Sequence, residues 1–168
     1  MELVLAGIER ASAPRDVWRA ASEMRPASML DVCAAAPDIA EAMVIFDGGR
    51  FEAYVVMHGG FDSFEVLADM VASCIGCASS QVVGCLYAAE GFDAALHALH
   101  VASGYDTFCA TDSSPVEAMR AAYAASVVHG VSGARASMNR RWRNTGPFPL
   151  LTSHNSSSTI CRNASCSP

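Results

Sequence analysis

The chain has 168 residues, of which 52% are hydrophobic and 17% are charged, and its formal net charge is −6. This length and composition predict one globular domain and exclude a wholly disordered chain. The acidic balance argues against a nucleic-acid partner, because phosphate contacts depend on clustered lysine and arginine.

The apolar segments and the cysteines indicate a compartment. No apolar run is long enough to span a membrane, and the first residues lack the basic start of a secretory signal peptide. Three of the seven cysteines, Cys74, Cys85 and Cys109, lie within apolar segments, where a reduced thiol behaves as a small hydrophobic group. We therefore predict a cytoplasmic protein with no membrane partner.

Two short helices are predicted in the N-terminal part of the chain. The first ends before Pro26, because proline cannot continue a helix. Ser28 and Asp31 have the spacing of a capping box, in which side chains satisfy the free N–H groups at a helix start, and they predict the opening of the second helix. We expect residues 1–38 to form a helical preamble packed on the core domain.

The middle of the chain predicts a hairpin followed by an amphipathic helix. Apolar runs on either side of the turn sequence DGGR at residues 47–50 predict two antiparallel strands. Asp62 and Glu65 have capping-box spacing, and the apolar residues after Asp62 recur at helical intervals. The expected apolar face consists of Phe64, Leu67, Met70, Val71 and Cys74. A further strand is predicted at residues 81–87.

Residues 92–103 fit two different structures. In a strand, Ala95, His97 and Leu99 would share one face, whereas the alanine content and Gly104 just past the segment favour a helix. The strand completes an α+β domain with a mostly antiparallel sheet of about five strands flanked by helices, which is the interpretation we adopt. The helix gives an α/β domain as the alternative.

The last regular element is a helix beginning after Ser114, with Pro115 at its first position and Glu117 at capping-box spacing. Its predicted inner stripe consists of Val116, Met119, Tyr123 and Val127. We expect the core domain to cover residues 39–130. Residues 131–168 are expected to form an extension and a poorly ordered, Ser-rich tail.

With the strand interpretation, the order of elements resembles the roadblock/LC7 family, small domains with a profilin-like layout. The resemblance covers residues 39–128 and lies in EAMVIFDGGRFEAYVVMHGG, in the following helix, and in LHALHVASGYDTFCATD. It implies a non-enzymatic, dimerising adaptor that binds a protein partner such as a small GTPase or a scaffold. The acidic chaperones of type III secretion have a similar element order and acidity, so a secretion-chaperone-like protein is an alternative.

A small-residue strip on the central helix offers a pairing surface. Ala68, Ala72 and Gly76 would allow close approach of a second chain, which predicts a homodimer or a paralogous heterodimer. The same strip could instead face solvent or pack under the preamble helices. We assign no catalytic, cofactor-binding or metal-binding residue.

A C-x-x-C motif at Cys74 and Cys77 is the first chemical candidate. It falls at the C-terminal end of the predicted helix, where the helix dipole disfavours a thiolate, so structural cysteines are the favoured interpretation. His97 and His100 could complete a zinc site with this pair only if a helix brings both imidazoles to one face.

Carboxylates at element ends give the second chemical candidate. With a helix at residues 92–103, Glu90 and Asp112 would follow neighbouring parallel strands, where open α/β sheets place their ligand sites. A small metal-dependent phosphotransfer enzyme is therefore a further alternative. Asp47 and Glu65 also lie at element ends, but a turn and a cap explain them. The chain has no P-loop, G-x-S-x-G or G-x-G-x-x-G motif, and we predict that it is not an enzyme.

Overall fold

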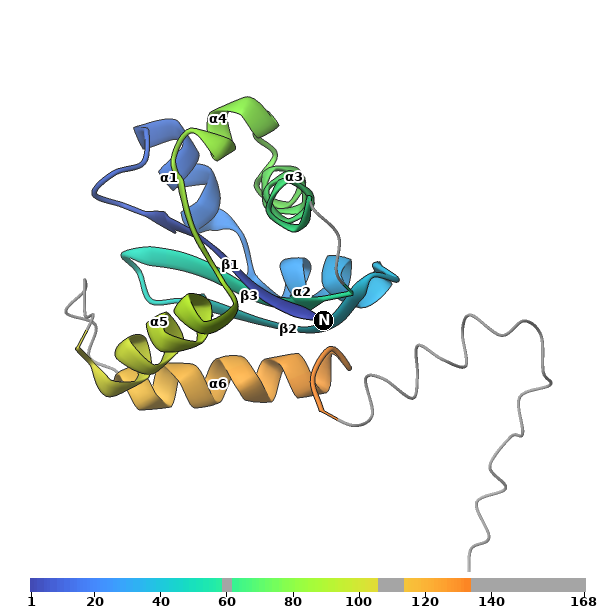
Figure 1. Cartoon of the computed structure of the whole chain (residues 1–168). Coiled ribbons are helices and arrows are strands. Elements are labelled where there is room, and N and C mark those ends of the chain that lie inside the picture. Colours follow the sequence, from blue (N-terminus) through green and yellow to red (C-terminus); the bar gives the residue numbers. More distant parts are fainter. Residues whose placement is uncertain (59–61, 106–113, 134–168) are drawn as a thin grey trace, which may run out of the picture.

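The computed structural model describes residues 1–58, 62–105 and 114–133. In these ranges a four-stranded antiparallel sheet, in the order β2-β3-β1-β4, carries helices on both faces (Figure 1). The predicted α+β domain with a mostly antiparallel sheet is confirmed. None of the helices in these ranges has the length and apolar character needed to cross a membrane.

The four strands are β1 (Glu2–Glu9), β2 (Ile39–Phe46), β3 (Arg50–Met57) and β4 (Leu86–Glu90). The predicted hairpin is formed by β2 and β3, which pair from Phe46 and Phe51 outward. Asp47 closes its turn, because Oδ1 of Asp47 accepts hydrogen bonds from the backbone N–H groups of Gly49 and Arg50 at 3.1 and 2.9 Å.

The N-terminal strand is the main departure from the expected layout. β1 lies between β3 and β4 and pairs antiparallel with both. Residues 1–38 therefore supply a central strand as well as two helices, whereas the sequence analysis began the core at residue 39. Short apolar strands of this kind carry little local signal when their partners lie far away in the sequence.

One face of the sheet, here named the first face, is covered by α1 (Arg15–Glu23), α2 (Pro26–Ala35), α3 (Ser63–Ile75) and α4 (Ser79–Val83). The opposite or second face is covered by α5 (Gly91–Ser103) and α6 (Pro115–Val128) (Figure 1). The predicted apolar side of α3 is confirmed: Leu67 and Val71 are buried, and its other members pack against the same core.

Residues 92–103 form helix α5, so the adopted strand is wrong and the helical alternative is correct for this segment. Gly104 takes the left-handed conformation at φ 73°, and Tyr105 N–H donates to the His100 carbonyl at 3.0 Å, which ends the helix in a Schellman-like cap. The described sheet consequently has four strands and not about five. The strand predicted at residues 81–87 begins only at Leu86, because α4 extends to Val83.

The helix starts follow proline more closely than capping boxes. α2 begins at Pro26, which places Ser28 inside the helix, and α6 begins at Pro115 as predicted. Asp62 and Ser114 occupy the N-cap positions of α3 and α6, but neither side chain makes a capping hydrogen bond.

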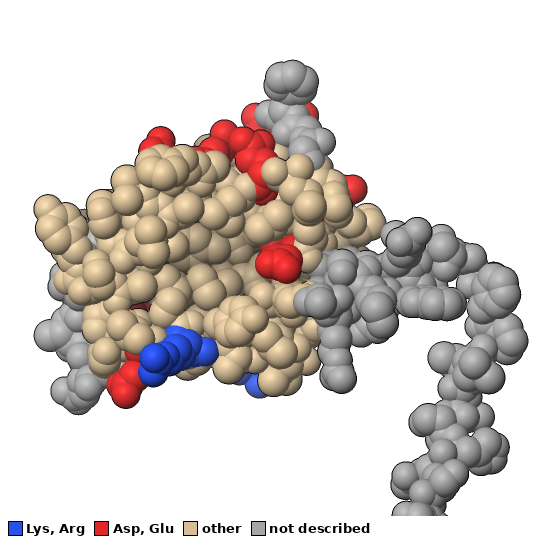
Figure 2. All heavy atoms as spheres, turned by 60° about the horizontal axis from the view of Figure 1, so that its bottom comes forward, with Lys and Arg blue, Asp and Glu red and all other residues tan. Residues whose placement is uncertain are grey.

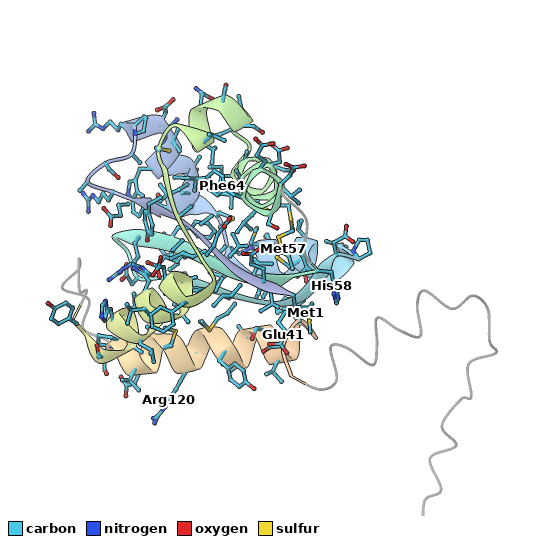
Figure 3. All side chains as sticks on the ribbon, in the orientation of Figure 1. Met1, Glu41, Met57, His58, Phe64 and Arg120 are labelled. Atoms are coloured by element: carbon cyan, nitrogen blue, oxygen red, sulfur yellow. The ribbon has the colours of Figure 1, made fainter. Side chains whose placement is uncertain are left out.

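The predicted inner stripe of α6 is correct only for Met119, which packs against the apolar cluster of the second face. Val116, Tyr123 and Val127 are exposed, and the helix instead buries Ala122 and Ser126. Small residues on that side let α6 lie close to the sheet. On the outer side, Arg120 extends away from the sheet, while on the first face Phe64 packs toward the core (Figure 3).

Candidate functional site

Buried charge marks a site on the second face. Among the described residues, the charged side chains that are buried are Arg50 and Glu52, with 2% and 0% of their surface exposed. Both lie on β3, where alternate residues point to opposite faces. Phe51 and Ala53 therefore join the core of the first face, while Arg50 and Glu52 point under α5.

The Glu52 carboxylate is the centre of a hydrogen-bonded network. Its Oε1 atom accepts from Tyr87 Oη at 2.6 Å and contacts His97 Nε2 at 2.7 Å and Arg50 Nη1 at 3.4 Å. Its Oε2 atom accepts from Tyr54 Oη at 2.8 Å. An ionised carboxylate can only accept, so in this arrangement His97 Nε2 carries a proton.

The network extends to the hairpin turn. Arg50 Nε donates to Asp47 Oδ2 at 2.9 Å, so the guanidinium joins two carboxylates. We name the complete group the Glu52 cluster. It consists of Asp47, Arg50, Glu52, Tyr54, Tyr87 and His97.

The hairpin turn, two strands and one helix position these side chains. The turn supplies Asp47, and β3 supplies Arg50, Glu52 and Tyr54. β4 supplies Tyr87, and α5 places His97 against the sheet. The imidazole lies beside both phenol rings, with ring centroids 5.8 Å from Tyr87 and 6.4 Å from Tyr54. His97 keeps 23% of its side-chain surface exposed, so ligands can reach the cluster from its side.

The charges of the cluster are nearly balanced. Two carboxylates, Asp47 and Glu52, face the single cation Arg50, and a protonated His97 would bring the sum to zero. Burial costs each ion several kcal/mol, and pairing with hydrogen bonds offsets that cost. Burial, and then the nearby Glu52 carboxylate, raise the pKa of Tyr87 far above its ordinary value, so this phenol remains a donor.

The arrangement suits ligand binding and proton transfer. A carboxylate that holds one imidazole nitrogen orients the ring and stabilises its charged form, as in acid–base dyads. Among the described residues no thiol joins the cluster, since Cys74, Cys77 and Cys85 pack against the core of the first face. Cys109 lies outside the described residues.

The C-x-x-C and histidine pairs do not come together. Cys74 and Cys77 lie on the first face, where the Cys74 thiol contacts Met29 Sδ at 3.5 Å and burial raises its pKa. His97 and His100 belong to α5 on the second face. The helix that the zinc hypothesis required is present, but the sheet separates the cysteine pair from the histidine pair.

The other candidates from sequence are placed as follows. Glu90 is exposed at the N-cap of α5, and Asp112 lies outside the described residues. Ala68 and Ala72 of the proposed pairing strip are buried within the domain, whereas Gly76 is the exposed C-cap of α3. Pairing through this strip stays a prediction.

Most of the Glu52 cluster was not identified from sequence. Asp47 was considered only as a turn residue and His97 only as a zinc ligand, and neither Glu52 nor Tyr87 was singled out. A signal does exist: charged residues at alternate positions interrupt β3, which is otherwise apolar (RFEAYVVM). A buried charge in a strand requires partners, and that requirement indicates a site.

A surface hollow lies next to the cluster. Its volume is about 460 Å³, between edge strand β2 and helix α6, and Ile45 in its wall is the cross-strand neighbour of Glu52. A second hollow, of about 590 Å³, is lined by α1 residues including Trp18 and lies away from the cluster. Neither hollow contains a cluster residue, so the chemistry of the cluster, and not cavity size, identifies the site.

Comparisons with known proteins agree on one family. Residues 7–142 match the family model of the glutamyl-tRNAGlu reductase N-terminal domain. A solved structure, glutamyl-tRNA reductase from Methanopyrus kandleri, is similar with a TM-score of 0.59 and 18% sequence identity, over 83% of this chain and 31% of that chain. That level of identity supports the fold alone. No curated protein matches the chain.

These findings correct the sequence-based identification. The roadblock/LC7 resemblance is wrong, and the adaptor function with its two alternatives is wrong with it, because the family model covers most of the described domain. The expectation of a non-enzyme is not confirmed, since the family is named for an enzyme. This chain belongs to the family of glutamyl-tRNA reductase N-terminal domains.

Proposed function

We propose that this domain recognises the glutamyl group of glutamyl-tRNA at the Glu52 cluster. The observation that carries the proposal is the buried Glu52 carboxylate, held by two phenols, an imidazole and a guanidinium in a domain of this family. Burying a charged group in an apolar domain costs free energy, so its presence indicates a role in function more than in stability.

The chemistry of the ligand fits the cluster. A glutamyl ester carries an α-ammonium group and a γ-carboxylate, so it needs partners of both signs. The cluster offers a guanidinium, Arg50, beside two carboxylates, Asp47 and Glu52. Arginine is suited to carboxylate recognition because its planar N–H groups match both oxygens.

Proton transfer is the second task we assign to the cluster. Reducing an aminoacyl ester with one hydride releases the ribose hydroxyl of the tRNA, and that oxygen must gain a proton. The doubly protonated imidazole of His97, which Glu52 holds at Nε2, is the candidate donor through its other ring nitrogen, Nδ1. Because no described thiol joins the cluster, the proposal contains no acyl-enzyme step.

The reduction itself needs more than this domain. The chain spans about a third of the length of the reductase it matches, 31% of that chain. Its sequence has no glycine-rich dinucleotide fingerprint, so we assign hydride donation to parts of that enzyme outside the matched region.

We limit the proposal to the aminoacyl end of the tRNA. The net charge is −6, and the face in Figure 2 shows few lysine or arginine atoms among its described residues. Phosphate binding requires such side chains in clusters. We keep the cytoplasm as the proposed compartment, consistent with Cys74, Cys77 and Cys85, none of which forms a disulfide.

A titration of the full chain with L-glutamic acid α-methyl ester, followed by NMR, tests the function. We expect saturable shifts at Glu52, Tyr87 and His97, because the ester carries both charges of the ligand. The matched control is L-glutamine α-methyl ester, which has the same size but lacks the γ-carboxylate charge. Equal affinity for both esters, or shifts confined to residues outside the cluster, would contradict glutamyl recognition.

A further inference from the structure

A glycine in the middle of the sheet makes the Glu52 cluster possible. Gly7 of β1 is the cross-strand partner of Glu52 on β3 and of Tyr87 on β4, so these three residues form one row across the sheet. Since residues in one row share a face, Gly7 lies directly between the phenol and the carboxylate.

The Tyr87 ring occupies the space above Gly7. A Cβ atom added to Gly7 would lie 2.1 Å from Tyr87 Cζ and 2.4 Å from Tyr87 Oη. Those distances are far shorter than any non-bonded contact, so each larger residue would displace the ring. The absence of a side chain at position 7 lets Tyr87 reach across β1 and donate to Glu52 Oε1 at 2.6 Å.

The same oxygen atom receives the imidazole. His97 Nε2 lies 2.7 Å from Glu52 Oε1, and the rings of Tyr87 and His97 meet at an interplanar angle of 57°. Tyr54 holds the other carboxylate oxygen, Oε2, at 2.8 Å. The orientation of the carboxylate, and with it the nitrogen of His97 that carries a proton, therefore depends on the phenols.

We infer that Tyr87, seated on Gly7, is a positioning residue of the candidate site. Its hydroxyl fixes Glu52 Oε1 so that His97 donates through Nε2, and this selects the imidazole tautomer that is presented to the ligand. Tyr87 acts through Glu52 and His97 and does not itself touch the reacting group. Neutral histidine donates from one nitrogen and accepts at the other, so the choice of tautomer decides which atom can take or give a proton.

Nitrogen NMR of the histidine side chains in the full chain tests this inference directly. In the wild-type protein we expect His97 as the Nε2–H tautomer, with a Nε2–H proton that exchanges slowly. Tyr87→Phe keeps the ring over Gly7 but removes the donor. We expect that proton to exchange at least about tenfold faster in this variant, with both nitrogens moving toward averaged tautomer values.

Two further variants complete the test. Tyr123→Phe makes the same chemical change at an exposed position on α6 and should leave the His97 signals unchanged. Gly7→Ala should disturb them at least as much as Tyr87→Phe, because the added methyl group excludes the ring. An Nδ1–H tautomer in the wild type, or unchanged His97 signals in Tyr87→Phe, would overturn the inference.

A ligand-binding measurement rests on the proposed function, whereas the NMR measurement of the His97 tautomer does not. We expect Tyr87→Phe to weaken binding of L-glutamic acid α-methyl ester about tenfold, because a misoriented Glu52 or His97 would lose about one hydrogen bond to the ester, with no change for Tyr123→Phe. If the wild type shows the expected tautomer but does not bind the ester, the glutamyl function fails and the positioning role stands. If the ester binds equally to wild type and Tyr87→Phe, the positioning role fails.

Discussion

The two faces of the sheet are built in different ways. The first face packs four helices on an apolar core to which β1, β2 and β3 all contribute, and its side chains need only fill space. The second face has a smaller apolar cluster around Leu5, Ile45 and Val101, and next to it lies the Glu52 cluster. Apolar core side chains can be replaced by others of similar volume, whereas each member of a buried polar network depends on the others.

This difference predicts which substitutions lower the stability of the domain most. On the second face, Glu52→Ala should lower the free energy of unfolding by about 3–5 kcal/mol, because it removes one partner of a buried ion pair and three further hydrogen bonds. Urea unfolding measures this. Glu65→Ala, at an exposed position on α3, is the control. A loss below about 1 kcal/mol would mean that the cluster is not held together through Glu52.

On the first face, Leu67→Ala should cost about 2–5 kcal/mol, since Leu67 is fully buried and truncation leaves a cavity. The matched control is Val66→Ala, whose side chain on the same helix is 45% exposed. The comparison is sharpened by the His97 NMR signals. We expect Leu67→Ala to leave them unchanged and Glu52→Ala to abolish their native pattern. If Leu67→Ala altered them equally, the two faces would not be independent.

The smallest expected effect is a dependence on alkaline pH. The folded-state pKa of Tyr87 is raised by burial and by Glu52, so its contribution to stability is complete below the ordinary tyrosine pKa of about 10. Above that pH the unfolded chain loses this proton while the folded protein keeps it. The free energy of unfolding should therefore fall by up to about 1.4 kcal/mol per pH unit.

Urea unfolding at several pH values above 10 measures that slope. In Tyr87→Phe the part of the slope due to this phenol should be absent, whereas Tyr123→Phe should retain it. Identical slopes in all three proteins would show that Tyr87 ionises as freely in the folded domain as in the unfolded chain.

Local chemistry was sufficient to predict part of the fold. The turn at Asp47 and Arg50 fixed the β2–β3 hairpin, and apolar residues at helical spacing predicted α3. Both depend on neighbours in sequence. β1 was missed because its partners, β3 and β4, lie more than forty residues away. The segment of α5 was ambiguous because its apolar residues satisfy both periodicities. Its alanines and Gly104 favoured the helix that the structure contains, and Gly104 is the C-cap of that helix.

The candidate site was harder to predict for the same reason. Its members come from the hairpin, from β4 and from α5, and only the register of three strands brings Glu52 and Tyr87 into one row. The role of Gly7 cannot be recognised from the sequence until that row is known. The alternating charges of Arg50 and Glu52 were the one local sign that β3 carries more than packing.

The central claim is that the Glu52 cluster recognises a glutamyl group, and calorimetric binding of a stable analogue tests it most directly. The analogue is glutamic acid linked through an amide to the 3′ position of 3′-amino-3′-deoxyadenosine, the terminal nucleoside of a charged tRNA. We predict saturable binding to the full chain, at least about tenfold weaker binding of the glutaminyl analogue, and loss of that discrimination in Arg50→Gln, which removes the guanidinium assigned to the γ-carboxylate. Equal binding of both analogues, or discrimination that survives in Arg50→Gln, would contradict the account.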